Sequence, residues 1–307
     1  MENKTKRKNQ FRKIELIFIW GMLVLPLLQW LIFWLIVNLS SIKLAFTDAR
    51  TDMFTFNNFE VFWENLTAPY GTIKTALFNT LKYFLTSLLI INPISMVIAY
   101  FLYKKIACYK LFRIVFYLPA IVSSVAMVAV YREVINPGGI IDALLKLFGS
   151  SVSPEGWLAR PTTATKAILV YTVWTGFGAN ILLFMGAMIR VPVEMLEAAK
   201  LDGCSAFREL VLLILPLILP TISTLVIITC TNIFSSSGPI LLFTSGNYET
   251  TTISYWIFEK IYGNGVLGGS PSNYNIASCT GLCFTLVGVP IILAIRYLMD
   301  KLPTVEY

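Results

Sequence analysis

Long apolar runs without charge are the feature that most restricts how this chain can fold. The run from Leu16 to Leu39 contains no charged residue, and across all 307 residues only 13% are charged while 56% are hydrophobic. A soluble domain carries about 25% charged residues. A helix needs about 20 apolar residues to cross the hydrocarbon core of a bilayer. The chain is therefore predicted to be an all-α integral membrane protein.

Six apolar stretches are long enough to be transmembrane helices. They cover Leu16–Leu39, Leu81–Tyr103, Ile114–Tyr131, Ala167–Ile189, Leu210–Phe234 and Tyr274–Ile295. Several prolines lie inside or at the ends of these stretches. Membrane helices tolerate such prolines because neighbouring helices can satisfy the freed backbone groups. We therefore expect about six spans, of which the third is the shortest.

Basic residues are distributed unevenly between the segments that join these spans. With residues 1–15 inside the cell, the cytoplasmic segments contain 15 of the 24 lysines and arginines and eight of the 17 acidic residues, a net charge of +7. This asymmetry fits the positive-inside rule. It places both termini, including the tail 301–307, in the cytoplasm and the loop 40–75 outside. It also explains the pI of about 9.1 without a nucleic-acid partner.

Residues suited to catalysis or metal binding are scarce. The chain has no histidine, which is the usual near-neutral base and the commonest metal ligand. It also lacks a phosphate-binding glycine loop of the GxxxxGK(S/T) type. Cys279 and Cys283 share a helix face without a nearby carboxylate, which favours packing over metal binding. We expect no catalytic residue, metal or cofactor in this chain, so uphill transport would need energy from another protein.

A charged segment, residues 191–216, separates the fourth and fifth predicted spans. Pro192 suits the first turn of a helix, and apolar residues recur at helical spacing through Val193–Asp202. Gly203 can adopt the left-handed conformation that ends a helix, and Ser205 can cap a second one. The pattern predicts a helix, a tight bend and a second helix beneath the membrane. An ordinary connecting loop also contains small residues and glycine, so both interpretations remain open.

The same segment resembles the EAA motif of ABC importer permeases. That motif reads EAA, three residues, glycine, nine residues and I-x-L-P, and the chain follows it from Glu197 through Gly203 to Pro216 with Leu213 in place of isoleucine. Cys204 replaces the alanine of the "DGA" form typical of carbohydrate-uptake members. Residues 116–145 and 238–262 also resemble segments of sugar permeases. The resemblance covers most of the chain after residue 75.

The resemblance implies a permease core at 76–300, with the EAA loop at 191–216 as the site of coupling to ATPase subunits. The coupling residues carried over are Glu197, Ala198, Ala199, Asp202, Gly203, Leu215 and Pro216. The implied partners are a second permease chain, commonly a different one, and two cytoplasmic ATPases that use Mg-ATP. An extracellular substrate-binding protein would deliver a sugar or oligosaccharide to this complex in a bacterial cell membrane.

Polar and aromatic side chains inside the spans are candidates for the substrate path. They are Asn79, Tyr83, Asn92, Tyr171, Trp174, Asn180 and Asn232. Sugar hydroxyls need hydrogen-bonding partners in a buried site, but contacts between helices or with the membrane interface explain each residue equally well. Lys82, near an outer end, is the one charged residue in the confident spans, which suits a neutral cargo.

Two further alternatives stay open from the sequence. A permease of the same family could carry a peptide or phosphate, and the charged loop could instead bind a regulator in a membrane signalling or scaffold subunit. Outside the membrane, residues 252–262 carry an apolar stripe of Ile253, Trp256, Ile257 and Ile261. A helix at the membrane interface and a docking surface both fit that stripe.

Overall fold

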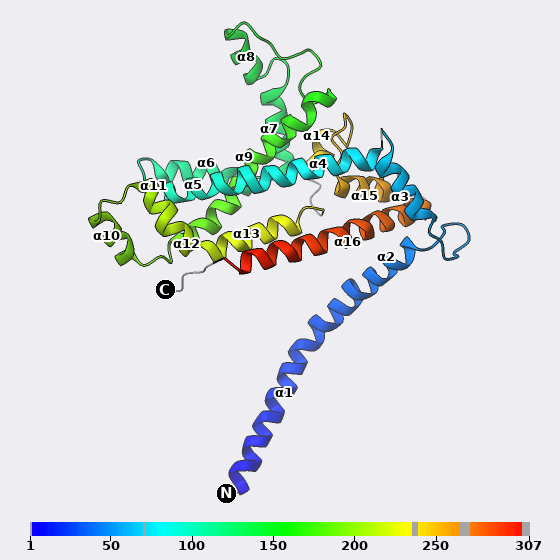
Figure 1. Cartoon of the computed structure of the whole chain (residues 1–307), viewed down its shortest axis with the longest axis vertical. Helices are drawn as coiled ribbons and strands as arrows, with labels where there is room; N and C mark the ends of the chain where they lie inside the picture. Colours follow the sequence, from blue (N-terminus) through cyan, green and yellow to red (C-terminus); the bar gives the residue numbers. More distant parts are fainter. Residues whose placement is uncertain (1, 70, 235–238, 264–270, 303–307) are drawn as a thin grey trace.

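The structure, a computed structural model, is a bundle of helices from which the N-terminal helix projects (Figure 1). It describes residues 2–69, 71–234, 239–263 and 271–302, with side chains from residue 15 onward except residues 17, 271 and 272. Residues 303–307 of the predicted cytoplasmic tail lie outside the described residues. Within the described ranges every named element is helical, and a single β-bridge joins Thr47 to Phe54.

The helices follow one another closely along the chain. Their bounds are α1 (Glu2–Trp30), α2 (Val37–Ala45), α3 (Asn57–Thr67), α4 (Thr72–Thr86), α5 (Asn92–Tyr103), α6 (Tyr109–Ile121), α7 (Ser124–Ile135), α8 (Ile140–Leu147), α9 (Pro161–Met188), α10 (Val193–Leu201), α11 (Ala206–Arg208), α12 (Leu215–Leu217), α13 (Leu219–Thr231), α14 (Ile240–Phe243), α15 (Ile253–Tyr262) and α16 (Pro271–Asp300). Wider π-helical turns at Leu31–Ile36, Ser87–Ile91 and Glu209–Ile214 join α1 to α2, α4 to α5 and α11 to α12.

The number of spans agrees with the sequence prediction, but two of the spans are broken. Four helices are long and apolar enough to cross a membrane, at Phe18–Ala45, Thr72–Tyr103, Pro161–Met188 and Asn273–Asp300. Two bent helix pairs bring the total to as many as six within the described residues. The predicted third span bends by 111° after Ile121, and the predicted fifth bends by 74° after Leu217.

The two bends have local backbone causes. After α6, Val122 and Ser123 adopt extended conformations, with ψ angles of 145° and 134°. In the fifth span, Pro216 and Pro220 flank Ile218, whose ψ of 8° departs from helical geometry. Because proline has no N–H to continue the helical ladder, two prolines four residues apart weaken the helix between them. Neither bend is visible as a drop in hydropathy.

The packing of the helices differs strongly between the middle of the chain and its N-terminal span. A core formed mainly by α5, α9 and the start of the fifth span includes fully buried Tyr100, Ile181 and Met188. By contrast, 0% of the most apolar window of the span Phe18–Ala45 is buried within the chain. Figure 1 shows α1 pointing away from the remaining helices, in dark blue. The first span is therefore an apolar helix that is open over its most apolar window and packs on the bundle only at its end, where α2 lies against α16 and Ala45 is buried.

The apolar stripe of α15 belongs to the internal core. Ile253 and Trp256 are buried, and the Trp256 ring nitrogen donates to the Thr72 hydroxyl at 3.1 Å. The stripe packs against α4 and α16, together with Ala76 and Cys279. Ile257 and Ile261 are half-buried, so internal packing accounts for the Ile253 and Trp256 part of the stripe.

Candidate functional site

The predicted helix–bend–helix segment is present and is called the hook here, residues 193–208. Its first helix, α10, spans Val193–Leu201. Gly203 follows with φ of +73°, and its N–H donates to the Lys200 carbonyl at 3.1 Å. A Cβ added at Gly203 would meet nothing within 4 Å. A side chain here would therefore be disfavoured by backbone conformation alone, since residues other than glycine rarely adopt this region.

One face of the hook packs on the bundle and the other is open. Leu196 is buried in the core near the predicted cytoplasmic end, whereas Glu197 and Ala198 are exposed. Leu201 is 89% exposed and Phe207 is 75% exposed. In Figure 1 the hook lies at the end of the bundle opposite α3 and α15. The open face of the hook therefore combines charged side chains with two large apolar ones.

The remaining residues of the motif mark the break in the fifth span. Leu215 and Pro216 belong to α12, directly before the 74° bend into α13. Both side chains are half-buried. Ser205 occupies the position before α11, although its side chain makes no capping hydrogen bond there. The motif therefore covers two structural features, the glycine bend of the hook and the proline bend inside the membrane.

A polar cavity lies within the bundle between α4, α5, α9 and α13, and its volume is about 280 Å³. Four of the seven predicted substrate-path residues line it, namely Tyr83, Asn92, Asn180 and Asn232. Hydroxyl-bearing residues complete the polar lining: Thr80, Ser87, Thr172, Thr229 and Thr252. Gly176 also faces the cavity, where a Cβ would stand 2.9 Å from the Ile91 side chain.

Hydrogen bonds join three helices across this cavity. The Asn180 amide on α9 donates to the Asn92 side-chain carbonyl at 2.8 Å, and the Asn92 amide donates to the Thr229 hydroxyl on α13 at 3.2 Å. The buried Tyr83 hydroxyl has no hydrogen-bond partner among the described residues. Because buried polar groups in proteins are nearly always paired, this hydroxyl calls for a partner such as water or a bound molecule.

The other three predicted residues have different surroundings. The Asn79 amide donates to the carbonyls of Glu249 and Thr251 at 2.6 and 3.0 Å, which anchors the loop before α15. The rings of Tyr171 and Trp174 pack at tilted angles against the ring of Tyr131, at ring-centroid distances of 5.2 and 6.3 Å. None of these three predicted residues is among those that line the polar cavity in the described structure.

The sequence prediction missed the hydroxyl-bearing residues, although helical spacing contained a signal for them. Thr80, Tyr83 and Ser87 recur three and four residues apart and so share one face of a helix. Thr172 and Asn180 are related in the same way through Gly176 on α9. Threonine inside a membrane helix usually bonds its own backbone, as Thr172 does with the Ile168 carbonyl at 2.9 Å. That local satisfaction makes such residues poor markers of a cavity by themselves.

Comparison with known proteins agrees with this architecture. The sequence profile of the family described as "Binding-protein-dependent transport system inner membrane component" matches residues 12–303. The chain is 28% identical to the arabinooligosaccharides transport system permease protein AraP of Bacillus subtilis (strain 168), over 60% of each protein. It is 24% identical to the multiple sugar-binding transport system permease protein MsmF of Streptococcus mutans, over 90% of this chain and 93% of that protein.

A longer relative and a solved structure extend the comparison. The maltose/maltodextrin transport system permease protein MalF of Escherichia coli (strain K12) is 27% identical over 73% of this chain, which is 45% of MalF. A bacterial ABC transporter involved in the import of the acidic polysaccharide alginate has a chain of the same fold, with a TM-score of 0.80 and 21% identity over 96% of this chain and 100% of that one. The match spans about 60% of AraP and less than half of MalF. Because the family profile covers nearly the whole sequence, this chain belongs to the family of binding-protein-dependent transport system inner membrane components.

Proposed function

We propose that this chain is the membrane-spanning permease subunit of an ATP-driven importer that carries a sugar or oligosaccharide into the cell. The observation that carries the proposal is the uncharged cavity between α4, α5, α9 and α13, where amide and hydroxyl groups gather inside an apolar bundle. Alternating access would open this cavity first to the outside and then to the cytoplasm. Membership of the transport family supports the same conclusion.

The lining of the cavity favours a neutral polyhydroxylated cargo. Asparagine and threonine side chains both donate and accept hydrogen bonds, as sugar hydroxyls do, and Tyr83 and Phe84 add aromatic ring faces. Among the residues that line this cavity in the described structure, none is charged. A phosphate would therefore lose hydration there without an ionic partner. Relatives named for arabinooligosaccharides, multiple sugars and maltose support a sugar, and a peptide is the alternative cargo.

Energy for uptake would come from two cytoplasmic ATPase subunits that hydrolyse Mg-ATP and dock on the hook. Exposed Glu197 and Ala198 and half-buried Ala199 offer a nearly flat helical surface for this contact, and exposed Leu201 extends it. Asp202 and Gly203 would hold the bend that aims this surface at the ATPase. Leu215 and Pro216, at the bend of the fifth span, would pass its movement into the membrane.

A second permease chain would complete the transport path, and we expect a different chain rather than an identical copy. The span Phe18–Ala45 supports such a partner, because 0% of its most apolar window is buried within this chain. Membrane lipid would cover the remaining apolar surface. An extracellular substrate-binding protein would deliver the cargo to the outer ends of the spans. Both termini and the hook would lie on the cytoplasmic side, with the loop 40–75 outside.

Transport by the reconstituted complex tests this proposal. The chain would be co-expressed with its partner permease and ATPases, placed in liposomes, and supplied with binding protein and, in turn, neutral oligosaccharides, uronic-acid oligosaccharides, peptides and inorganic phosphate. We expect ATP-dependent uptake of a neutral oligosaccharide. Uptake of a charged compound alone would contradict the assignment of the cargo. A hook that binds no ATPase would contradict the assignment of the chain as an importer subunit.

A further inference from the structure

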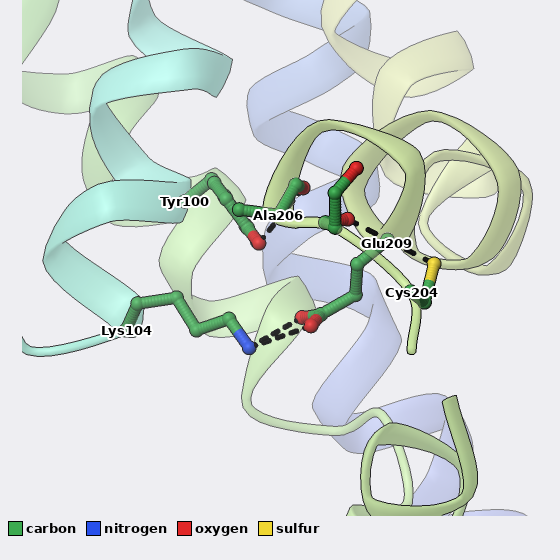
Figure 2. Close-up of polar contacts among 6 residues, drawn as sticks. Tyr100, Lys104, Cys204, Ala206 and Glu209 are labelled. Carbon is green, nitrogen blue, oxygen red and sulfur yellow. Dashed lines mark hydrogen bonds and ion pairs between the residues drawn. The ribbon is translucent and has the colours of Figure 1, made fainter. Parts of the chain in front are cut away.

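An ion pair between a half-buried lysine and a buried glutamate joins the end of the second span to the start of the fifth. The Lys104 ammonium lies 2.6 Å from Glu209 Oε1 and 2.8 Å from Oε2. The Glu209 side chain is 3% exposed, and that of Lys104 is 26% exposed. Figure 2 shows both contacts, which cross between helices that are 105 residues apart in the sequence. Removing one member of a buried pair leaves the other charge uncompensated, so this contact strongly favours the two helix ends staying together.

A second contact lies one helical turn away on the same face of α5. The Tyr100 hydroxyl donates to the backbone carbonyl of Ala206 at 3.0 Å, and the Lys104 ammonium lies 5.8 Å from the centre of the Tyr100 ring. Ala206 begins α11, the second helix of the hook. Tyr100 in the last turn of α5 therefore contacts the hook at one backbone position, and Lys104, which directly follows α5, contacts the fifth span at one side chain, as Figure 2 shows.

The opposite end of α5 reaches the polar cavity. Asn92, its first residue, makes the hydrogen bonds to Asn180 and Thr229 across that cavity. The 12 residues of α5 span about 18 Å at 1.5 Å per residue. Before Asn92, the π-helical turn Ser87–Ile91 interrupts the regular helix. Such turns weaken the continuity of a helix and are common at functional sites. The helix is thus held to the hook at one end and to the cavity at the other.

We propose that Lys104 and Glu209 are positioning residues that make α5 a rigid link between the hook and the polar cavity. This inference rests on the proposed function, in which a partner ATPase moves the hook. When the hook moves, Glu209, which directly follows it, moves as well, and the ion pair carries the end of α5 with it. The rotation of α5 about the Ser87–Ile91 turn then shifts Asn92 against Asn180. The pair touches no cargo and acts only through the helix that it fixes.

Charge reversal in the assembled complex separates this role from a general effect on folding. The variants are Lys104→Met, Glu209→Gln, the reversed pair Lys104→Glu with Glu209→Lys, and the conservative Lys104→Arg. Lys105→Met is the matched control, because Lys105 is the next residue, is exposed and has no ion pair in the described structure. Each complex is purified in nanodiscs, and ATP hydrolysis is measured with and without saturating binding protein and its cargo.

We expect Lys104→Met and Glu209→Gln to lower the ratio of stimulated to basal ATP hydrolysis at least about fivefold, the lower end of typical coupling between sites. The reversed pair and Lys104→Arg should recover most of that ratio, and Lys105→Met should not change it. Single variants that assemble and keep the wild-type ratio would overturn the proposal. If the single variants do not assemble, the test rests on the reversed pair. A reversed pair that assembles but shows no stimulation of ATP hydrolysis would also overturn the proposal.

Hydrogen–deuterium exchange in the same complexes distinguishes failure of this inference from failure of the proposed function. Amides in 206–214 should exchange faster in Lys104→Met than in Lys105→Met, while those in α16 should not differ. If binding protein and cargo do not stimulate ATP hydrolysis by the wild-type complex but the exchange difference is present, the importer function is rejected and the positioning contact is supported. If ATP hydrolysis by the wild-type complex is stimulated but the exchange difference is absent, only the positioning contact is rejected.

Discussion

The hook and the polar cavity are two polar regions of an apolar chain, and they differ in the charge and exposure of their side chains. The hook carries full charges that are exposed, and the residue that directly follows it, Glu209, is buried against Lys104. The cavity uses only neutral groups, which bond one another across helices. A charged side chain is costly where water is absent, so the charged side chains remain at the membrane surface, where another protein can contact them. Neutral amides and hydroxyls can line the cavity without selecting a bound molecule by its charge.

The largest expected effect tests the hook alone. Gly203→Val should abolish most uptake, by at least about tenfold, because a β-branched residue at φ of +73° costs about 1–3 kcal/mol and would move the bend. Membrane insertion should be unchanged, since open space surrounds this position. Transport assays and membrane fractionation measure the two quantities.

Gly149→Val is the matched control for this change. Gly149 has φ of +74° and equally open space, but it follows α8 in a predicted outer segment. If both variants lose uptake to the same extent, backbone strain anywhere in the chain would explain the result, and the special role of the hook would be contradicted.

A smaller effect tests the cavity. Asn180→Ala removes the donor that pairs with Asn92 and leaves a buried carbonyl oxygen unsatisfied, which costs about 1–3 kcal/mol. We expect the KM of uptake to rise about tenfold, with ATPase docking unchanged. Asn65→Ala serves as the control, because its amide bonds only the Val61 carbonyl within α3. An equal change in KM from Asn65→Ala would contradict a specific role for the cavity.

The smallest effect distinguishes cargo contacts from structural contacts. Tyr83→Phe removes a hydroxyl that has no partner among the described residues. Thermal stability without cargo should therefore not fall, while KM should rise about threefold, as expected for loss of a net hydrogen bond of about 0.5–1.5 kcal/mol. Tyr131→Phe should lower thermal stability and leave KM unchanged, since its hydroxyl donates to the Ala167 carbonyl at 2.8 Å. A loss of stability in Tyr83→Phe with no change in KM would assign its hydroxyl to the fold.

Sequence patterns predicted the local features of both regions but not their contacts. Helix α10 ends one residue before the predicted end at Asp202, and Gly203 adopts the expected left-handed conformation. In the cavity, four predicted residues come together, whereas Asn79 instead anchors a loop 170 residues away in the sequence. Nothing local separates Asn79 from Asn92, because both are asparagines in apolar helices. Only the direction in which each side chain faces distinguishes them.

The sequence by itself determined that the chain is helical, that it has about six spans and that a charged hook precedes the fifth. These properties follow from the free energy of placing side chains in lipid or water and from the backbone freedom of glycine, which act over a few residues. The tertiary structure decided the bends of the third and fifth spans, the pairing of Lys104 with Glu209 and the cavity around Asn92. These depend on which helices become neighbours, and a buried polar group takes whatever partner packing brings within hydrogen-bonding distance.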